Sequence, residues 1–115
     1  MIDEWIRETK GKVDPDSLGM ILVHNGVVRA TSKAGKPVKS MRVDYDEVAL
    51  EASLQEMKRR EGIVEARAWL NKGTLKVGDD IMYVLVAGRF RTDVLPVMQE
   101  LLTIIKKEII HEEEV

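Results

Sequence analysis

The chain has 115 residues, no cysteine and a formal net charge of −2. This length suits one domain with its own hydrophobic core, and the near-neutral charge provides no general attraction to nucleic acids or anionic membranes. The absence of cysteine excludes disulfides, thiolate metal sites and a cysteine nucleophile. No apolar run approaches the roughly 20 residues of a membrane span, and the first residues lack the order of a signal peptide, so we expect a cytoplasmic protein.

The amino-terminal part of the chain predicts a short element, a loop and a strand. Residues 2–10 have few apolar positions and fit either a short helix or a strand. Residues 11–19 combine Pro and Gly with Asp and Ser, as loops do. The apolar run over 20–30 predicts a strand, in which Asn25-Gly26 marks either a hairpin turn or a bulge in one long strand.

A basic, flexible loop at 31–37 is expected before the next strand. Alternating apolar and polar side chains over 38–46 predict a half-buried strand. Asp46 is placed to cap a helix over 47–61, and Gly62 fits the position just after its C-cap. The buried stripe of this helix is expected to consist of Leu50, Leu54 and Met57.

The strands of the second half follow from two apolar stretches separated by a turn. Residues 63–75 predict one strand, 76–80 a turn, and 81–90 the most apolar strand of the chain. Strands paired in hairpins, with helices packed on one face of an antiparallel or mixed sheet, make an α+β fold. We expect a single domain over residues 1–115.

A last helix is expected after these strands. Thr92 or Asp93 is placed to cap it, and Pro96 falls in its first turn, where proline is tolerated. The acidic residues 111–115 are expected to form a frayed, solvated tail. The buried stripe of the helix is expected to consist of Leu95, Met98, Leu102 and Ile105.

Cationic side chains gather where the predicted strands and helices end. Arg29 closes the first strand, Arg89 and Arg91 follow the most apolar strand, and Lys106 and Lys107 lie late in the last helix. Arginines at the ends of neighbouring strands can converge on a phosphate or carboxylate, beside which a lysine can act as an acid or a nucleophile. The alternative is ordinary exposed charge, in which the two lysines complement the dipole of the helix C-terminus.

Other kinds of chemistry lack their usual sequence signals. The chain has no phosphate-binding loop, dinucleotide fingerprint or zinc-ligand spacing, and no motif surrounds a serine nucleophile. His24 and His111 are not spaced as metal ligands with other donors. We therefore expect no metal and no bound cofactor.

Several short motifs follow one another in an order that resembles that of a known protein family. Gly26-Val27-Val28-Arg29 is followed by the Gly-containing loop 30–37, by Val43-Asp44-Tyr45 and by a helix. The stretch 71–108 adds a Gly-x-Leu-x-x-Gly-Asp hairpin, an apolar strand, a basic turn and a long helix that ends in lysine. In this order and spacing the chain resembles the large, catalytic subunit of molybdopterin synthase over about residues 18–110.

The resemblance implies an α+β fold of the α/β hammerhead type and a role in molybdenum cofactor biosynthesis. The family is a transferase that adds two sulfurs to cyclic pyranopterin monophosphate and so makes the dithiolene of molybdopterin. The sulfur arrives as a thiocarboxylate at the C-terminal Gly-Gly of a small ubiquitin-like carrier subunit. The large subunit is a homodimer with one carrier inserted at each end, which makes a heterotetramer. A chain without cysteine is compatible with this reaction, because the carrier brings the sulfur.

The resemblance also implies roles for particular residues. Lys106 matches the first of two active-site lysines and is the expected catalytic residue. Arg29 matches an arginine that helps to bind the substrate phosphate, and Arg91 matches the arginine of a His-Arg pair in the same pocket. Phe90, in the place of that histidine, and Lys107 complete the expected substrate-binding set.

The chain departs from the family pattern in the hairpin, where Leu70-Asn71 replaces an earlier His-Arg pair, in the missing Trp of the segment after the last helix, and at two site positions. Phe90 replaces the pocket histidine, and Glu113 stands where a gap-free alignment places the second lysine. A change from Lys to Glu reverses the charge that faces an anion, and like charges within ~4 Å cost about 1 to 4 kcal/mol. Lys107 or Lys72 could substitute for the missing lysine.

Three hypotheses about function follow. Arg29, Arg91 and Lys106 favour a divergent molybdopterin synthase large subunit. Phe90 and Glu113 favour a homologue of the same fold that binds a pterin or a carrier and has lost sulfur transfer. The third hypothesis is a small α+β dimer that binds a small anion and resembles the family by accident.

Overall fold

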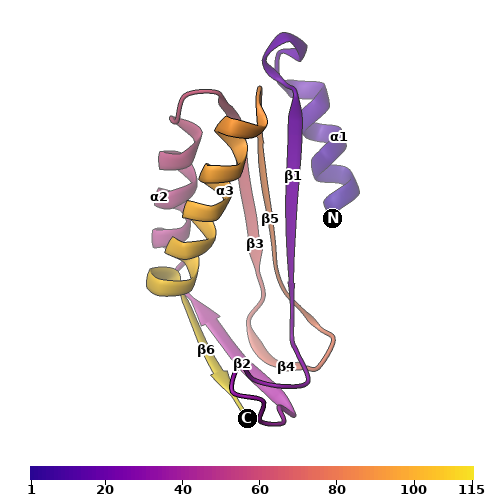
Figure 1. The fold of residues 1–115 in the computed structure, drawn as a ribbon, viewed down its shortest axis with the longest axis vertical. Coiled ribbons are helices and arrows are strands. Elements are labelled where there is room, and N and C mark those ends of the chain that lie inside the picture. Colours follow the sequence, from indigo (N-terminus) through magenta and orange to yellow (C-terminus); the bar gives the residue numbers. More distant parts are fainter.

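Two three-stranded antiparallel sheets and three helices build the molecule, and the computed structural model describes all residues 1–115. The elements in chain order are α1 (Ile2–Lys12), a 3₁₀ turn (Pro15–Ser17), β1 (Met20–Val27), β2 (Ser40–Tyr45), α2 (Glu47–Lys58), β3 (Ile63–Leu70), β4 (Gly73–Lys76), β5 (Asp80–Gly88), α3 (Arg91–Ile104), a π-helical turn (Ile105–Ile109) and β6 (Ile110–Glu114). The larger sheet has the order β1-β5-β3 and the smaller one β4-β2-β6. Figure 1 shows the smaller sheet at one end of an elongated molecule of 47 × 25 × 23 Å. None of the helices is long and apolar enough to cross a membrane.

Strand β5 is the centre of the larger sheet and is buried on both faces. Successive side chains of a strand point to opposite faces. Val84 and Val86 therefore pack with α2 and α3, whereas Leu85 and Ala87 pack with Trp5 of α1. The expected α+β class is confirmed, and α1 proves to be a helix that covers the face opposite α2 and α3 (Figure 1).

Helix α2 matches the sequence prediction closely. The Asp46 carboxylate accepts a hydrogen bond of 3.0 Å from the backbone N–H of Ala49, and the predicted stripe of Leu50, Leu54 and Met57 is buried. The predicted end is wrong, because the helix stops at Lys58. Gly62 lies later, in the turn before β3, with a φ of +80° that favours glycine.

Helix α3 begins earlier than predicted, and of its predicted stripe Met98, Leu102 and Ile105 face the core while Leu95 does not. Phe90 is its N-cap and provides no side-chain hydrogen bond, while Asp93 accepts from Arg89 instead. Pro96 lies inside the helix and not in its first turn. Leu95 is 44% exposed, so the predicted stripe is partly wrong. The buried side chains of α3 and the turn after it are Val94, Val97, Met98, Leu101, Ile105 and Ile109.

The predicted strand over 63–75 is divided between the two sheets. Its break lies at Asn71, whose side-chain amide donates to the Asp80 carbonyl at 3.0 Å and accepts from the Lys72 N–H at 2.8 Å. These local hydrogen bonds compete with regular strand pairing. At Asn25-Gly26 no hairpin forms. Strand β1 continues to Val27 with a register shift after Gly26, which supports the bulge alternative.

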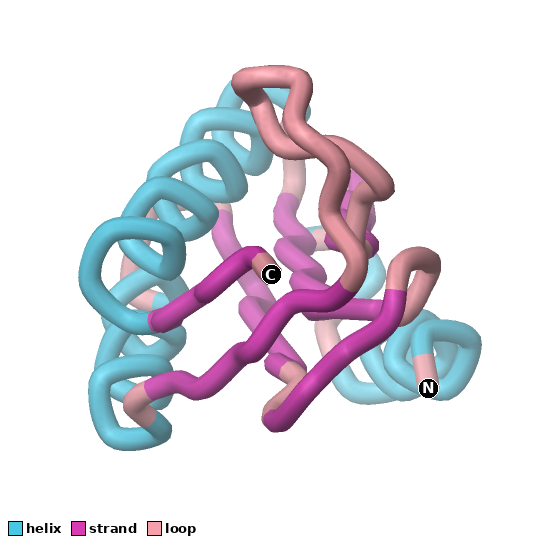
Figure 2. Tube along the Cα trace, turned by 90° about the horizontal axis from the view of Figure 1, so that it is seen from below, coloured by secondary structure: helices cyan, strands magenta, loops and turns pink.

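The acidic C-terminal segment is a strand and not the predicted frayed tail. Strand β6 pairs antiparallel with β2, with Ile110 opposite Tyr45 and Glu114 opposite Met41. Ile109, just before the strand, and Ile110, its first residue, are buried, so the chain is anchored where it turns back to the sheet. Figure 2, seen from the end that carries the smaller sheet, shows the C-terminal strand lying beside its neighbour.

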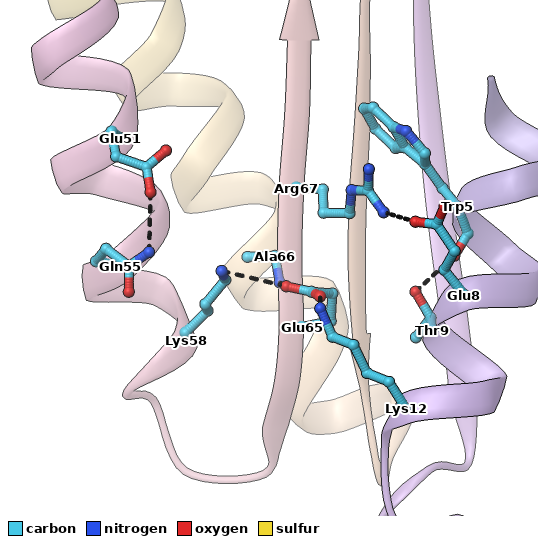
Figure 3. A network of polar contacts seen from close by, with 10 residues as sticks. All are labelled: Trp5, Glu8, Thr9, Lys12, Glu51, Gln55, Lys58, Glu65, Ala66 and Arg67. Carbon is cyan, nitrogen blue, oxygen red and sulfur yellow. Dashed lines mark hydrogen bonds and ion pairs between the residues drawn. The ribbon is translucent and has the colours of Figure 1, made fainter.

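A buried carboxylate joins both helical layers to the edge of the larger sheet. The Glu65 side chain on β3 is 3% exposed and contacts Lys12 of α1 at 2.6 Å and Lys58 of α2 at 3.4 Å (Figure 3). Burial by itself raises the pKa of Glu65. The hydrogen bond from Lys12, the charge of Lys58 and the N–H of Ala66 outweigh it and hold the pKa below the ordinary value.

We predict that Glu65→Gln lowers the free energy of unfolding at pH 7 by about 1–2 kcal/mol, because charge-assisted hydrogen bonds to a buried group are lost. A carboxylate with a lowered folded-state pKa stabilises the fold above its unfolded pKa of about 4.3, and this contribution disappears as the pH falls through the folded pKa. Urea titrations at pH 7 and pH 3 measure both effects. The control is Glu61→Gln, whose side chain is 87% exposed. Equal losses in the two variants would contradict the role of Glu65.

Candidate functional site

A pocket of about 330 Å³ lies where the larger sheet, the smaller sheet and the end of α3 meet. Its apolar wall comes from Val27 of β1, Met41 of β2, Ile81 and Met82 of β5, and Leu102 of α3. The ionisable side chains that line it are His24, Arg29, Lys33, Lys106 and Glu112. The pocket residues come from β1 and the loop after it, from β2, β5 and β6, and from α3 with the turn that follows it, so only the folded chain brings them together.

Arg29 is presented by the segment that follows β1. Val28 is buried, and its backbone bonds to the 78–79 turn: the Val28 N–H donates to the Asp79 carbonyl at 3.0 Å, and the Val28 carbonyl accepts from Gly78 at 2.9 Å. Arg29 itself is exposed and has no ion-pair partner in the chain. Its guanidinium is therefore free to bind an anion in the pocket.

Lys106 enters the same pocket from the π-helical turn. Ile105 and Ile109 of this turn are completely buried and fix its orientation. The Lys106 Nζ lies 3.3 Å from the Glu112 carboxylate, which is 16% exposed. π-helical turns are rare and occur frequently at functional sites. The structure thus places Arg29 and Lys106, which lie far apart in the sequence, on one pocket.

Phe90 and Arg91 lie at the opposite end of α3 from this pocket. The helix between Arg91 and Lys106 contains 14 residues, and at a rise of about 1.5 Å per residue it separates them by roughly 20 Å. Phe90 is 60% exposed. Within one chain, neither residue reaches the pocket. Lys107 is next to Lys106 in sequence but does not line the pocket.

Arg89, another cation noted in the sequence, has structural partners. Its guanidinium hydrogen-bonds to Asp93 at 3.0 Å and Glu61 at 3.3 Å, and both bonds raise the pKa of Arg89. It also lies 5.3 Å from the ring centre of Phe90. These contacts hold the turn between β5 and α3. The partners of Arg89 all lie outside the pocket.

Three pocket residues were not singled out as site residues by the sequence. Met20 and Leu22 of β1 face α3, so alternation along the strand puts His24 on the same side, where the core opens into the pocket. Lys33 lay in a loop and Glu112 in a segment interpreted as a tail. Glu112, and not the exposed Glu113, is the carboxylate beside Lys106. Of these, only the alternation around His24 was a usable signal.

The charge of the pocket suits an anionic ligand. Arg29, Lys33 and Lys106 contribute three positive charges, and Glu112 contributes the one carboxylate. Gly26 keeps the wall open, because a Cβ there would lie 3.2 Å from Met82 Cγ and 3.6 Å from His24 Nε2. No group of three or more His, Cys, Asp or Glu side chains is arranged to hold a metal ion.

We predict that Glu112→Gln strengthens anion binding, because the carboxylate no longer competes for Lys106. The expected gain in sulfate affinity is about two- to fivefold, since an exposed ion pair contributes at most about 1 kcal/mol. NMR titration of the Arg and Lys side-chain signals at constant ionic strength measures it. Glu114→Gln makes the same change in net charge outside the pocket and serves as the control. Equal sulfate affinities in the two variants would contradict the competition.

Comparison with known proteins identifies the family to which this chain belongs. The family model described as "MoaE protein" matches residues 2–108. An uncharacterized protein of Methanocaldococcus jannaschii is 29% identical over 110 residues, which cover 92% of this chain and 88% of that one.

Solved structures share the fold at lower identity. A molybdopterin synthase from Staphylococcus aureus superimposes with a TM-score of 0.77 at 18% identity, over 96% of this chain and 82% of the other. A complex of subunits 1 and 2 of the molybdopterin-converting factor from Helicobacter pylori gives 0.76 at 17%, over 98% and 74%. An accidental likeness is therefore excluded: the chain belongs to the MoaE family, the large subunits of molybdopterin synthase.

Proposed function

We propose that this protein is a molybdopterin synthase large subunit that acts in the cytoplasm. It transfers sulfur from a thiocarboxylated carrier to cyclic pyranopterin monophosphate. The observation that carries the proposal is the meeting of Arg29 and Lys106 in one positively charged pocket. Both are residues to which the family resemblance gives a role, and they come from segments far apart in the sequence.

The pocket residues divide into binding and reacting groups. Arg29, with no carboxylate partner, binds the phosphate of the pterin through its guanidinium fork. Lys106 meets the thiocarboxylate at the carrier's C-terminus, where its positive charge balances the anionic sulfur and orients it toward the substrate. Glu112 holds Lys106 in position until the anion replaces it.

A second copy of the chain is needed if Arg91 takes part. Arg91 lies roughly 20 Å along α3 from Lys106, so it can reach a pocket only from a neighbouring subunit. A two-fold homodimer that sets the start of one α3 beside the pocket of its partner brings Arg91 and the adjacent Phe90 to the substrate. The carrier subunit is the further partner, by analogy with the Helicobacter pylori molybdopterin-converting factor, which is a complex of two subunits.

A binding protein without sulfur transfer is the second candidate. The ion pair between Lys106 and Glu112 favours it, because a carboxylate occupies the lysine that the reaction would use. Phe90 favours it as well, since a phenyl ring cannot exchange protons as the family's histidine can. Lys72 does not compensate for the missing lysine, because it pairs with Glu47 at 3.0 Å and does not line the pocket.

We predict that the protein with thiocarboxylated carrier and cyclic pyranopterin monophosphate produces molybdopterin. Lys106→Ala should lower kcat by about 100-fold, the range found when a group that transfers protons or stabilises charge is lost. Arg29→Ala should raise KM for the pterin by about tenfold through loss of a charge-assisted contact. Conversion of product to a fluorescent pterin derivative measures both.

Lys107→Ala is the matched control, because it removes the same charge one residue away and outside the pocket. Its kcat should stay within about twofold of the wild type. Saturable pterin binding without product would support the binding protein. Equal kcat values for Lys106→Ala and wild type would remove Lys106 from the mechanism.

The shared site predicts complementation between inactive variants. Lys106→Ala and Arg91→Ala homodimers should each be impaired, whereas a mixed dimer contains one site with both wild-type residues. Random mixing by co-expression should restore about one quarter of the wild-type activity in an isologous dimer. Activity no higher than the mean of the two parents would show that Arg91 does not act on the pocket of its partner.

A further inference from the structure

We propose that Lys33 and Arg29 form a two-point clamp for a phosphate group at the rim of the pocket. The clamp deepens the proposed function and rests on it for the identity of the substrate that carries the phosphate. The binding of phosphate itself does not depend on the sulfur-transfer reaction. Lys33 thus becomes a substrate-binding residue supplied by the loop between β1 and β2.

The loop that carries Lys33 is a hydrogen-bonded hairpin. At its base, the Val38 N–H donates to the Ala30 carbonyl at 2.8 Å, and Thr31 and Pro37 form a β-bridge. At its tip, the Gly35 N–H donates to the Ser32 carbonyl at 2.9 Å, which closes a four-residue turn. Figure 1 shows this segment beside the smaller sheet, at the end of β1.

Lys33 is the second residue of that turn, and the turn aims it at the pocket. The Ser32 Oγ accepts from the Lys36 N–H at 3.2 Å, and the Ser32 N–H donates to the Lys36 carbonyl at 2.9 Å. Gly35 has a φ of +82°, a conformation that other residues rarely adopt. The hydrogen bonds of Ser32 and the conformation of Gly35 therefore fix the backbone on both sides of Lys33. Lys33 lines the pocket, whereas Lys36 on the same hairpin does not.

The distribution of charge separates the clamp from the catalytic lysine. Lys106 is neutralised by Glu112, the only carboxylate in the pocket. Arg29 and Lys33 have no ion-pair partner. The unbalanced positive charge of the pocket thus lies on Arg29 and Lys33, on its β1 side.

Phosphate fits this pair better than a carboxylate does. A guanidinium binds two oxygens of a phosphate through its planar fork, and an ammonium adds a mobile point charge on a further oxygen. Two unpaired cations match a group with up to two negative charges and oxygens on several sides. A planar carboxylate with one charge would leave one cation without a counter-charge.

The test is a titration of the full chain with inorganic phosphate, followed by NMR at constant ionic strength because screening weakens such contacts. Phosphate should shift the Arg29 side chain and the Ser32–Gly35 amides saturably. Lys33→Ala should weaken phosphate binding by about five- to tenfold, the effect of one partly exposed charge-assisted contact. Lys33→Arg should remain within about twofold of wild type. Lys36→Ala, which removes the same charge from the same hairpin, should bind as wild type does.

A variant that keeps every charge tests the role of the turn. A Cβ at Gly35 would meet no atom within 4 Å, so Gly35→Ala acts only on the backbone conformation. It should weaken phosphate binding about two- to threefold with Lys33 intact. Thermal unfolding of each variant checks that the fold is retained.

The outcomes separate the clamp from the proposed function. Phosphate binding that depends on Lys33, without molybdopterin formation, supports the clamp and contradicts the synthase. Molybdopterin formation with equal phosphate affinity in Lys33→Ala and Lys36→Ala contradicts the clamp and leaves the synthase standing. The clamp is also overturned if phosphate causes no saturable shift. The same holds if acetate binds as tightly as phosphate and depends equally on Lys33.

Discussion

The burial of β5 on both of its faces is the constraint on which the rest of the molecule depends. Its side chains form the floor of both hydrophobic clusters, so α2 and α3 must cover one face and α1 the other. Because β1 pairs along β5 and α3 packs across the same sheet, the end of β1 and the end of α3 arrive at the same place. Arg29 follows the end of β1, and Lys106 follows the end of α3. The meeting of Arg29 and Lys106 is thus a consequence of how the core is covered, and the smaller sheet and the loop that carries Lys33 complete the pocket.

The chain reversal after α3 completes this arrangement. Ile105, Ile109 and Ile110 are buried, and they turn the backbone from helix to strand within a few residues. The turn holds Lys106 at the pocket while β6 brings Glu112 back to it. One anchored segment therefore supplies both the catalytic candidate and the carboxylate that holds it. The ion pair with Glu112 keeps Lys106 oriented, although Glu113 stands where the family resemblance places a second lysine.

Local signals predicted the elements that depend on local chemistry. The cap at Asp46 and the stripe of Leu50, Leu54 and Met57 arise from hydrogen bonds and spacing within one helix, so the sequence alone reveals them. Strand β6 could not be predicted in this way, because an acidic segment with low strand propensity becomes a strand only through its pairing with β2. The pocket roles of Lys33 and Glu112 depend on contacts between distant segments. The resemblance to the family found Arg29 and Lys106. The predicted helix already separated Arg91 from Lys106, but the resemblance assigned both to one pocket, which Arg91 does not reach within a single chain.

On the proposed function, a phosphorylated pterin binds between Arg29 and Lys106 at the junction of the two sheets. A crystal structure of the protein soaked with cyclic pyranopterin monophosphate tests it most directly. We expect phosphate density within hydrogen-bonding distance of the Arg29 guanidinium, at about 2.7–3.2 Å, with the pterin ring against Met82 and Leu102. Ligand density elsewhere on the chain, with this pocket empty in a fully soaked crystal, would contradict it.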